Sequence, residues 1–520
     1  MMFKKFIKEY LLTFLVMLLI ILIGAYLRFG NLTIIPVFAD EAIYIRWSQV
    51  MMSEPTLRFL PLSDGKQPLF MWLTIPFLKV FADPLFAGRA LSAFSGLITS
   101  IGIFFLGNLL FKSKKVGVIA SLLYIVAPFT IFFDKLALAD SLLSMFGVWI
   151  ILFSILTVRT KRFDLAMVTG FLLGGALLTK STALFFSILI PVTWLLSDYP
   201  KKFSKKIIHL FKLIIVFIPT YLIGYGMYNI LRLGPNFHLI GSRNFDYVYP
   251  YSHILTSPLD PFLPFFDRSF EWIRMMGPWP ILLLALLGIV FNCKKYFKET
   301  LVIFSLFMCP IVAQSEFAKV YTARYMFFTL PYLFILGSSA LLNSKKIIKD
   351  FLIVFIIFTV FISLKFDYLL LNDPEKANLP RSERSGYLEE WTAGTGIKEI
   401  SEFIRLEYQK DPNTKIIVGT EGYFGTLPDG LQIYLNDLKE VTVIGVGLNF
   451  EYLPESLNES KKFGNKTYLV VNSDRLNNSS EKLGLNLVAA YPKSIKPDGS
   501  RQTLYLFELT DKALKLNNSK

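Results

Sequence analysis

Long apolar segments recur along the first 370 residues and decide what this chain can fold into. The first, 11–29, is nearly uncharged. At about 1.5 Å per helical residue it is long enough to cross the roughly 30 Å hydrocarbon core of a bilayer. Only 18% of the residues are charged and 53% are hydrophobic, whereas about 25% of residues are charged in soluble domains. Ten further apolar segments follow, at about 88–111, 116–133, 137–157, 164–179, 181–197, 207–231, 278–292, 300–316, 324–342 and 348–366. We therefore predict a polytopic α-helical membrane protein with about 11 transmembrane helices.

Basic residues between these segments predict the orientation of the chain. Three lysines precede the first segment, which we interpret as an uncleaved helix, and they place the N-terminus in the cytoplasm. The segment 67–81 contains two prolines and a lysine, and whether it crosses the membrane decides the side of five basic loops: 112–115, 159–162, 201–206, 294–295 and 345–346. If it does not cross, all five loops lie in the cytoplasm, as the positive-inside rule requires. We therefore predict that 67–81 lies in the outer interface of a bacterial or archaeal plasma membrane. Everything after residue 371 is then extracytoplasmic.

From residue 372 the composition changes to that of a soluble domain. We expect a helix around 396–409, followed by five β-rich runs at 415–419, 441–445, 467–471, 485–490 and 503–507. Strands that alternate with helical stretches indicate a small α/β domain. The predicted domains are a transmembrane domain at 1–371, with large outer loops at 31–88 and 232–277, and an extracytoplasmic α/β domain at 372–520. The glycine-containing loop 419–425 follows a strand but lacks the spacing of a dinucleotide-binding loop.

The net charge of +15 does not indicate nucleic-acid binding. Residues 373–520 contain 19 Lys and Arg but 21 Asp and Glu, so the positive excess lies in the short loops between apolar segments. There it is an orientation signal and not a phosphate-binding surface. Cys293, Cys309 and the three histidines show no metal-ligand spacing. The sequence predicts no certain cofactor, and it leaves a divalent metal open without supporting one.

Asp40 and Glu41 follow the first apolar segment and lie on its predicted outer side. In a structural interpretation, Asp40 caps the helix that begins there and Glu41 complements the helix dipole. In a chemical interpretation, one carboxylate acts as a base, because a glycosyl acceptor hydroxyl needs a base within hydrogen-bond reach. A cap also holds a carboxylate rigidly, so the two interpretations are compatible and both stay open.

Other charged residues gather at the predicted outer ends of the spans. They are Lys66 at the start of the interfacial helix, Asp140 one turn into a helix, Lys180 at a turn, and Glu316, Lys319 and Arg324 around a later turn. Carboxylates beside an apolar core usually have paired or functional roles, and a guanidinium suits bidentate contact with phosphate. Interfacial anchoring is the alternative for the cations. Asp134 is expected to form a surface pair with Lys135, and the aromatic-rich loop containing Arg243 is either an interfacial belt or a substrate lining.

Several motifs in this order resemble one known family. Asp-Glu-Ala-Ile-Tyr at 40–44, Lys-Gln-Pro-Leu at 66–69 with Trp72, Gly-Arg-Ala-Leu-Ser at 88–92 and Leu-Ala-Asp at 138–140 look like the opening of the protein O-mannosyltransferase and lipid A aminoarabinose transferase superfamily. Leu-Leu-Thr-Lys at 177–180 and Arg-Tyr at 324–325 with Pro331 are similar to later landmarks. The resemblance covers roughly residues 1–345.

The resemblance implies a membrane glycosyltransferase of the C-type fold, family 39-like, that uses a polyprenyl-phosphate-linked sugar. In the family, the acid of the first outer loop is the proposed catalytic base, which falls on Asp40. Glu41 and Asp140 would complete an acidic wall. The lysine of the Lys-Pro-Pro-Leu motif is associated with the donor phosphate and falls on Lys66, although Gln67 here replaces the first proline.

By the same resemblance, Arg324 would be a second contact to the donor phosphate, and Lys180 is assigned to the same group of cations. Tyr44, Arg243 and Glu316 are candidates for lining the substrate. No histidines stand where a metal-binding member would need them, so no metal is carried over.

We therefore expect transfer of a hexosyl or pentosyl group from a polyprenyl-phosphate donor to a lipid, glycan or protein acceptor at the outer face of the membrane, with inversion at the anomeric carbon. The expected partners are this donor, the acceptor and membrane lipids, and not nucleic acid. The soluble tail would bind the acceptor or cover the site. The main alternative is a transporter or flippase of lipid-linked glycans, which predicts charged residues near mid-membrane in discontinuous helices.

Overall fold

The fold is built from two compact units, each assembled from segments that are separate in the sequence. The computed structural model describes residues 2–342, 345–511 and 513. The membrane unit consists of Met1–Leu32, Leu57–Leu73 and Arg89–Pro380, and the sheet unit consists of Thr33–Thr56, Thr74–Gly88 and Arg381–Lys520. The last segment of the sheet unit begins close to the predicted domain boundary at 371/372. The structure adds to it two parts of the first outer loop, 33–56 and 74–88.

The membrane unit is helical. Its α-helices are α1 (Met2–Phe29), α5 (Lys114–Val126), α6 (Pro128–Asp134), α7 (Ala139–Thr160), α8 (Phe163–Thr179), α9 (Leu184–Leu189), α10 (Phe203–Tyr228), α11 (His238–Tyr247), α12 (His253–Thr256), α13 (Phe262–Met276), α14 (Pro280–Asn292), α15 (Phe297–Phe317), α16 (Ala323–Met326), α17 (Leu330–Ser339) and α18 (Lys346–Asn372). Short 3-10 segments lie at Pro55–Leu57, Leu60–Asp64, Ser181–Ala183, Ile190–Leu196, Asn229–Leu233, Phe327–Thr329, Ala340–Leu342 and Pro374–Lys376. Two helices, α3 (Leu69–Val80) and α4 (Pro84–Phe111), cross from one unit to the other.

By length and apolar composition, seven helical segments in the described part of the chain could each cross a membrane, or nine if two bent pairs are counted as spans. The predicted span 116–133 is such a pair, because α5 and α6 meet at 62°. The predicted span 278–292 is only the second arm of a pair bent by 111°. The predicted spans 164–179 and 181–197 are shorter apolar helices, as is α3. The prediction of eleven spans and the orientation derived from it therefore stay predictions.

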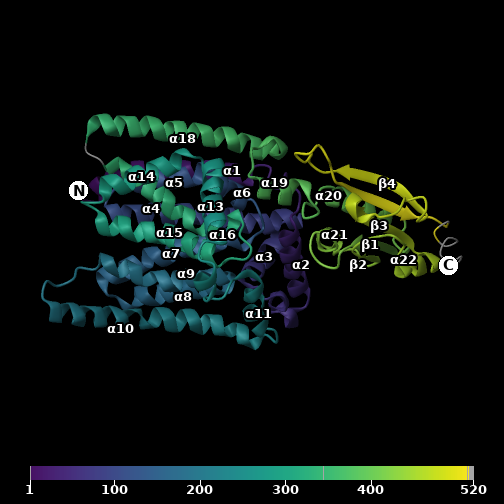
Figure 1. Cartoon of the computed structure of the whole chain (residues 1–520), viewed down its shortest axis with the longest axis horizontal. Helices are drawn as coiled ribbons and strands as arrows, with labels where there is room; N and C mark the ends of the chain where they lie inside the picture. The colour runs from purple at the N-terminus through teal and green to yellow at the C-terminus, as the bar shows by residue number, and fades with distance from the viewer. Residues whose placement is uncertain (1, 343–344, 512, 514–520) are drawn as a thin grey trace. The chain divides into compact units, whose positions relative to one another are not determined.

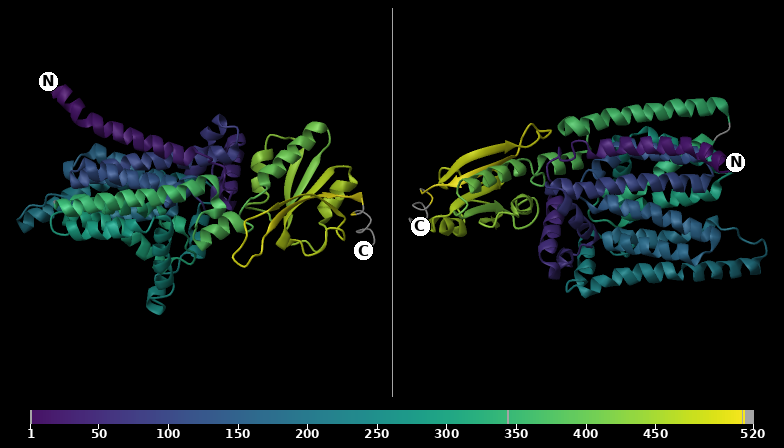
Figure 2. Two further views of the ribbon diagram at one scale, coloured as in Figure 1. Left: turned by 90° about the horizontal axis from the view of Figure 1, so that it is seen from above. Right: turned by 180° about the vertical axis from the view of Figure 1, so that it is seen from behind.

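Burial differs strongly among the long helices. In the most apolar windows of α1 and α18, 22% of residues are buried, against 72% in α7. Both α10 and α18 lie at the edge of the helical bundle in Figure 1 and in the right-hand view of Figure 2. Small residues allow α8 and α10 to pack closely, because a Cβ atom on Gly170 would lie 2.9 Å from the Thr220 carbonyl oxygen. Close packing at small residues is typical of helices that associate within a membrane.

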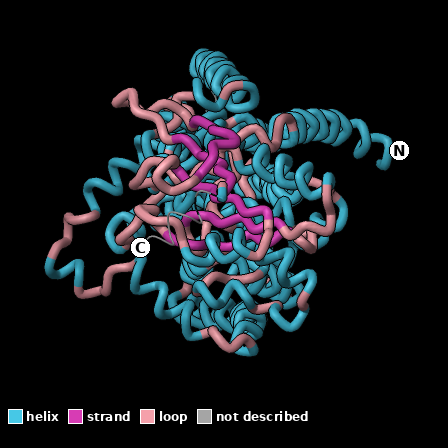
Figure 3. The backbone as a smooth tube through the Cα atoms, turned by 90° about the vertical axis from the view of Figure 1, so that its right-hand side faces the viewer, coloured by secondary structure: helices cyan, strands magenta, loops and turns pink. Residues whose placement is uncertain are grey.

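The sheet unit contains a five-stranded mixed sheet. Its strands are β1 (Ile416–Glu421), β2 (Val441–Gly447), β3 (Lys466–Asn472), β4 (Leu485–Pro492) and β5 (Thr503–Leu509), in the order β2-β1-β3-β5-β4. Strands β2, β1 and β3 are parallel, whereas β5 pairs antiparallel with β3 and β4. The strands are magenta in Figure 3. Each lies within two residues of a run predicted from the sequence, so the prediction of a small α/β domain is confirmed.

Helices cover both faces of this sheet. The helices of the sheet unit are α2 (Ala39–Ser53), α19 (Arg381–Arg384), α20 (Ile397–Lys410), α21 (Asp429–Leu435) and α22 (Glu455–Lys462), with a π-helical turn at Ser385–Glu389. On one face, Leu457 of α22 packs in a buried cluster with Leu469 and Val471 of β3. On the other face, Phe403 of α20 contacts Tyr468 with ring centroids 5.9 Å apart. Because side chains alternate along a strand, β3 is buried on both faces.

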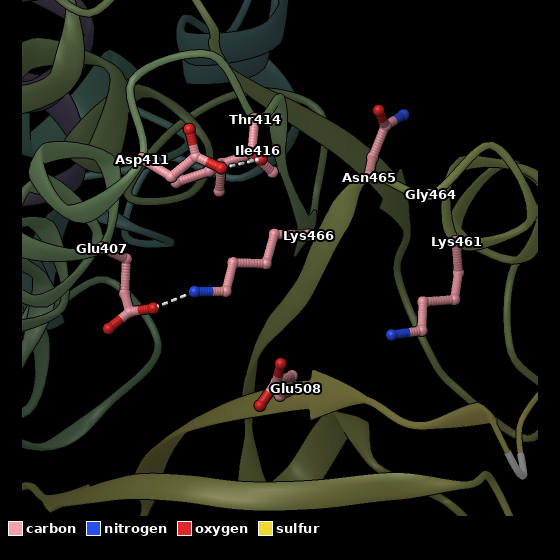
Figure 4. A pocket seen from close by; sticks show the side chains of 9 residues that line it. All are labelled: Glu407, Asp411, Thr414, Ile416, Lys461, Gly464, Asn465, Lys466 and Glu508. Carbon is pink, nitrogen blue, oxygen red and sulfur yellow. Dashed lines mark hydrogen bonds and ion pairs between the residues drawn. The ribbon is translucent and has the colours of Figure 1, made fainter.

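The sheet unit has a pocket of about 300 Å³ at the edge where β1 and β3 begin (Figure 4). Within it, Glu407 accepts a hydrogen bond from Lys410 at 2.6 Å and also pairs with Lys466. These bonds from Lys410 and Lys466 lower the pKa of the Glu407 carboxyl. Asp411, Lys461 and Glu508 contribute further charged side chains to the lining.

In the membrane unit, an ion pair is completely buried between α1 and α6. Arg28 donates from Nε to Oδ2 of Asp134 at 2.9 Å, and both side chains are 0% exposed. Arg28 also donates to the Ile125 carbonyl oxygen at 3.1 Å. The predicted surface pair between Asp134 and Lys135 is therefore wrong: Lys135 is buried and donates to the Gly30 carbonyl oxygen. Asp134 is instead paired with a cation that lies 106 residues earlier in the sequence.

The buried pair predicts a large loss of stability when one partner is removed. We expect Arg28→Met to lower the free energy of unfolding by about 3–5 kcal/mol, because it leaves the Asp134 carboxylate buried without its cation. The measurement is thermal unfolding of the purified protein in detergent. The double variant Arg28→Met/Asp134→Leu should recover most of the loss. Arg162→Met, at an exposed pair with Asp164, is the control and should change stability far less, because solvent screens an exposed ion pair. Equal effects of the two single variants would contradict the expectation.

Burial of Lys493 predicts a pH dependence of the sheet unit. Its ammonium is 1% exposed and donates to the Glu390 carbonyl oxygen at 2.9 Å, and burial lowers the pKa of Lys493 to about 8. The folded state therefore releases this proton at lower pH than the unfolded state. Stability should rise between about pH 8 and 10, by at most about 1.4 kcal/mol per pH unit.

The measurement is hydrogen-exchange protection of β3 amides in the wild type and in Lys493→Met. Comparing the two proteins at the same pH cancels the intrinsic exchange rate. The protection of the wild type relative to the variant should increase from pH 8 to pH 10. A constant ratio would show that the Lys493 pKa is not lowered.

Candidate active site

Three of the residues selected from the sequence meet in the membrane unit near Tyr325. Lys180, which ends α8, donates from Nζ to Oδ1 of Asp140 at 2.6 Å. The same Nζ lies 4.7 Å from the centroid of the Tyr325 ring, and the Arg324 guanidinium lies 5.4 Å from it. Asp140 is the second residue of α7, and not one turn into the helix as predicted. Its carboxylate is nearly buried, at 4% exposed. Three separate helix ends therefore place one acid and two cations around one aromatic ring.

Lys66 lies in a turn that also holds Arg243. Asp64 joins them: its Oδ2 is 3.4 Å from Lys66 Nζ, and its Oδ1 is 2.9 Å from an Arg243 guanidinium nitrogen. Gly65 connects Asp64 and Lys66 with φ at +66°, where a Cβ atom would lie 2.7 Å from Arg243 Cγ. Only glycine fits this turn without strain. The loop of Arg243 is thus seated directly on the segment that presents Lys66.

Gln67 connects the segments of Lys66 and Lys180. Its Nε2 donates to the Ser181 hydroxyl at 2.7 Å. Lys66 and Lys180 each precede one partner of this hydrogen bond in the sequence. The glutamine that replaces a proline of the family motif therefore makes a contact that proline could not make.

Asp40, Glu41 and Tyr44 belong to the sheet unit, on α2. The helix begins at Ala39 with Phe38 as its N-cap, so the predicted capping role of Asp40 is wrong. Glu41 is 0% exposed and accepts a hydrogen bond from the Phe38 backbone nitrogen at 3.0 Å. A carboxylate at this third position that bonds back to the N-cap is one half of a capping box. Of the acidic pair, Glu41 therefore has the capping role at the start of the helix. Asp40 lies at the second position of the helix and is half-buried.

The helix α2 is an integral part of the sheet unit. Gln49 donates to the Ile433 carbonyl oxygen of α21 at 2.8 Å. The Ala39 backbone nitrogen donates to the Thr392 carbonyl oxygen at 3.1 Å. Tyr44 stacks on Trp47, with ring centroids 6.2 Å apart. The position of Asp40 is therefore fixed by contacts with a segment more than 350 residues away.

Glu316 lies near the end of α15 and is 6% exposed. Among the described residues, its Oε1 has no hydrogen-bond partner. The chain beyond it pairs with the loop of Arg243, since Tyr249 donates from its backbone nitrogen to the Phe317 carbonyl oxygen at 2.7 Å. Glu316 and Arg243 thus lie on two segments that are joined by backbone hydrogen bonds, and substrate lining stays a prediction for both.

The sequence analysis missed the role of Asp64 in holding two cations. It also missed Arg28, although a single charge inside an otherwise apolar span is a signal of a buried partner. Within the part of the chain that the structure describes, no group of three or more His, Cys, Asp or Glu side chains is placed to hold a metal ion.

Comparison with known proteins shows similarity in sequence over part of the chain and similarity in fold over most of it. Residues 65–223 match the family model described as dolichyl-phosphate-mannose-protein mannosyltransferase. This stretch contains Lys66, Asp140 and Lys180. No match was found among curated protein sequences.

Solved structures are similar over nearly the whole chain. ArnT from Cupriavidus metallidurans in the apo state has a TM-score of 0.56 at 14% identity, covering 94% of this chain and 97% of ArnT. The same protein bound to undecaprenyl phosphate has a TM-score of 0.53 at 15% identity, covering 96% and 98%. A more distant likeness is to the oligosaccharyltransferase AglB from Archaeoglobus fulgidus, with a TM-score of 0.47 at 11% identity, covering 96% and 74%.

At these identities the ArnT structures establish the fold, and the family model adds agreement in sequence over 65–223. The resemblance predicted from the motifs is confirmed: the chain has the fold of the C-type membrane glycosyltransferase superfamily, of the protein mannosyltransferase and ArnT type.

Proposed function

We propose that the protein transfers a sugar from a polyprenyl-phosphate donor to a lipid, glycan or protein acceptor at the outer face of a membrane. The observation that carries this proposal is the convergence of Asp140, Lys180 and Arg324 around Tyr325. Cations at helix ends in a membrane unit are suited to a lipid phosphate, which lies at the same level as the helix ends. The ArnT structure that holds undecaprenyl phosphate supports the donor class.

In the proposed reaction, Asp40 accepts the proton of the acceptor hydroxyl. The acceptor oxygen forms a bond to the anomeric carbon while the bond from that carbon to the phosphate oxygen breaks. The electron pair of the broken bond leaves with the polyprenyl phosphate. Attack on the side opposite the leaving group would invert the anomeric carbon.

The cations would stabilise the departing phosphate, because negative charge grows on it in the transition state. Lys66, Lys180 and Arg324 are the proposed contacts. Lys66 Nζ lies 3.4 Å from Oδ2 of Asp64, so a donor phosphate would share this ammonium with the carboxylate. Arg243 bonds to the same Asp64 and would still compensate its charge.

The arrangement of buried charge supports an enzyme more than a transporter. A transporter predicts charges near mid-membrane. Here the buried Arg28, Asp134 and Asp367 each lie within six residues of the end of their helix. Glycan transport without chemistry is the alternative that the experiments below test.

We expect Asp40→Asn to abolish sugar transfer, because an amide cannot accept the proton. The measurement is release of radiolabelled sugar from a panel of polyprenyl-phosphate-linked hexoses and pentoses by purified protein in detergent. Glu54→Gln, which alters an acid just beyond the end of the same helix, is the matched control and should retain activity. Near-normal transfer by Asp40→Asn would remove Asp40 from the mechanism. Tight donor binding by the wild type without any turnover would favour the transporter.

A variant of Lys180 can separate a role in binding the donor phosphate from a role in folding. If Lys180 contacts the donor phosphate, Lys180→Met should raise the KM for donor by at least tenfold, because a charge-assisted contact contributes about 1.5–3 kcal/mol. Asp140→Asn should raise the KM much less, because it leaves the cation in place. Equal KM values for the wild type and Lys180→Met, together with a lower unfolding temperature of the variant, would show that the bond to Asp140 is only structural.

A further inference from the structure

The carboxyl ends of β1 and β3 form a topological switch point in the sheet unit. After β1 the chain turns toward β2 on one side, and after β3 it turns toward β4 and β5 on the other. In open α/β sheets, ligands bind outside the carboxyl ends of the strands where the connections diverge in this way. Here Glu421 ends β1 and Asn472 ends β3. The proposed function assigns no role to this edge.

A buried polar cluster lies at the switch point. Glu421 accepts hydrogen bonds from the Asn472 backbone nitrogen at 2.6 Å and from its side-chain Nδ2 at 2.7 Å. Gln502, which precedes β5, donates to Asp474 at 2.9 Å. Lys493, which follows β4, lies next to it, since its backbone nitrogen donates to the Gln502 carbonyl oxygen at 2.9 Å. Strands β1, β3, β4 and β5 all contribute to this edge.

Three polar atoms at this edge are buried and, among the described residues, have no hydrogen-bond partner. They are Oδ1 of Asn472, Oε1 of Gln502 and Oγ1 of Thr426. Leaving such atoms unpaired costs about 1–3 kcal/mol each. Two of them are amide oxygens, which only accept hydrogen bonds. A ligand that satisfies them must donate, as a hydroxyl group does and a fully ionised phosphate does not.

The charges of the cluster balance and do not favour an anion. The carboxylates Glu421, Asp474 and Glu390 lie beside two lysines, Lys493 and Lys496, and Arg501, which donates to the Lys493 carbonyl oxygen. One lysine, Lys496, already pairs with Glu390 at 2.9 Å. A neutral ligand with many hydroxyl groups is therefore better matched than a phosphate.

Three large aromatic side chains border the cluster and are exposed. Trp391 directly follows Glu390, and Tyr423 and Phe424 follow Glu421 in the loop 422–425. Their exposed fractions are 41%, 67% and 46%. The loop and Trp391 are close, because a Cβ atom on Gly425 would lie 3.8 Å from the indole ring. Exposed rings beside convergent polar groups provide an apolar face and hydrogen bonds together. The two faces of a sugar ring, one lined by C–H groups and one rimmed by hydroxyls, match this combination.

We propose that this edge binds the carbohydrate part of the acceptor, with Tyr423, Phe424 and Trp391 stacking on sugar rings and Asn472 and Gln502 accepting from hydroxyls. This inference rests on the proposed function, because it assumes that the protein receives an acceptor. It narrows the acceptor class to a glycan or glycolipid.

The geometry within the sheet unit supports a link between this edge and Asp40. Phe424 contacts Trp47 of α2, with ring centroids 5.7 Å apart. Asp40 lies seven residues before Trp47 on the same helix, which corresponds to about 10 Å along the helix axis. The proposed base and the proposed acceptor site therefore belong to the same unit and are joined through α2.

The test is binding of the fluorescently labelled full-length protein, in detergent, to an array of neutral oligosaccharides, sugar phosphates and Ser/Thr-rich peptides. We expect the wild type to bind at least one neutral oligosaccharide. The variant Tyr423→Ala/Phe424→Ala should weaken this binding at least tenfold, and Asn472→Ala should weaken it as well. Phe463→Ala is the matched control, because Phe463 is an aromatic residue of the sheet unit that is 82% exposed and precedes Gly464 of the pocket at the opposite edge. It should bind like the wild type.

Binding to peptides alone, to sugar phosphates alone or to nothing would overturn the inference. So would oligosaccharide binding that the loop variant retains. Protection of β1 amides from hydrogen exchange should be equal in the loop variant and the wild type, so that lost binding is not lost folding. Hydrolysis of the lipid-linked donor, measured in the same samples, separates the two proposals. Donor turnover without oligosaccharide binding would refute only the acceptor site, whereas oligosaccharide binding without turnover of any donor would refute the transferase.

Discussion

The buried ion pair between Arg28 and Asp134 is the interaction on which the candidate site of the membrane unit depends. A carboxylate among apolar helices is stable only beside a cation with well-placed hydrogen bonds. Arg28 provides both, because it also bonds to the Ile125 carbonyl oxygen at the end of α5. The pair fixes the end of α6, and only four residues separate it from α7. The first turn of α7 contains Asp140, which binds Lys180 beside Tyr325. The buried pair thus holds the end of α6 in place. Through the short connection to α7 it also helps to place Asp140 and the lysine that Asp140 binds.

The sheet unit is complete only with parts of the first outer loop, 33–56 and 74–88. The helix α2 packs on α21 and contributes Trp47 to the contact with Phe424. Glu41 is used inside this structure as the acid that bonds back to the N-cap, and Asp40, the proposed base, is the neighbouring acid on the same helix. The soluble segment after residue 381 therefore helps to position the proposed base, because it packs against the helix that contains Asp40. A tail that only covered the membrane unit would not need this shared core.

The sequence predicted the elements whose signal is local. The five strands and the helix α20 lie within two residues of their predicted positions, because each is a short run with clear alternation or amphipathic spacing. The family motifs also led to residues that do meet in space: Asp140, Lys180 and Arg324. Span counting was less successful. Bent pairs such as α5 and α6 have the composition of one span and the geometry of two helices, and composition does not reveal a 62° bend.

By itself, then, the sequence determined that the chain is a polytopic helical membrane protein with a small α/β domain, and it marked the charged residues worth examining. These properties follow from composition and periodicity, which each segment carries alone. Only the tertiary structure decided the partners: Arg28 and not Lys135 for Asp134, Asp64 between Lys66 and Arg243, and Phe38 rather than Asp40 as the cap of α2. Whether a buried charge or a strand edge is satisfied depends on groups brought together from distant parts of the chain. That information is absent from any single stretch of sequence.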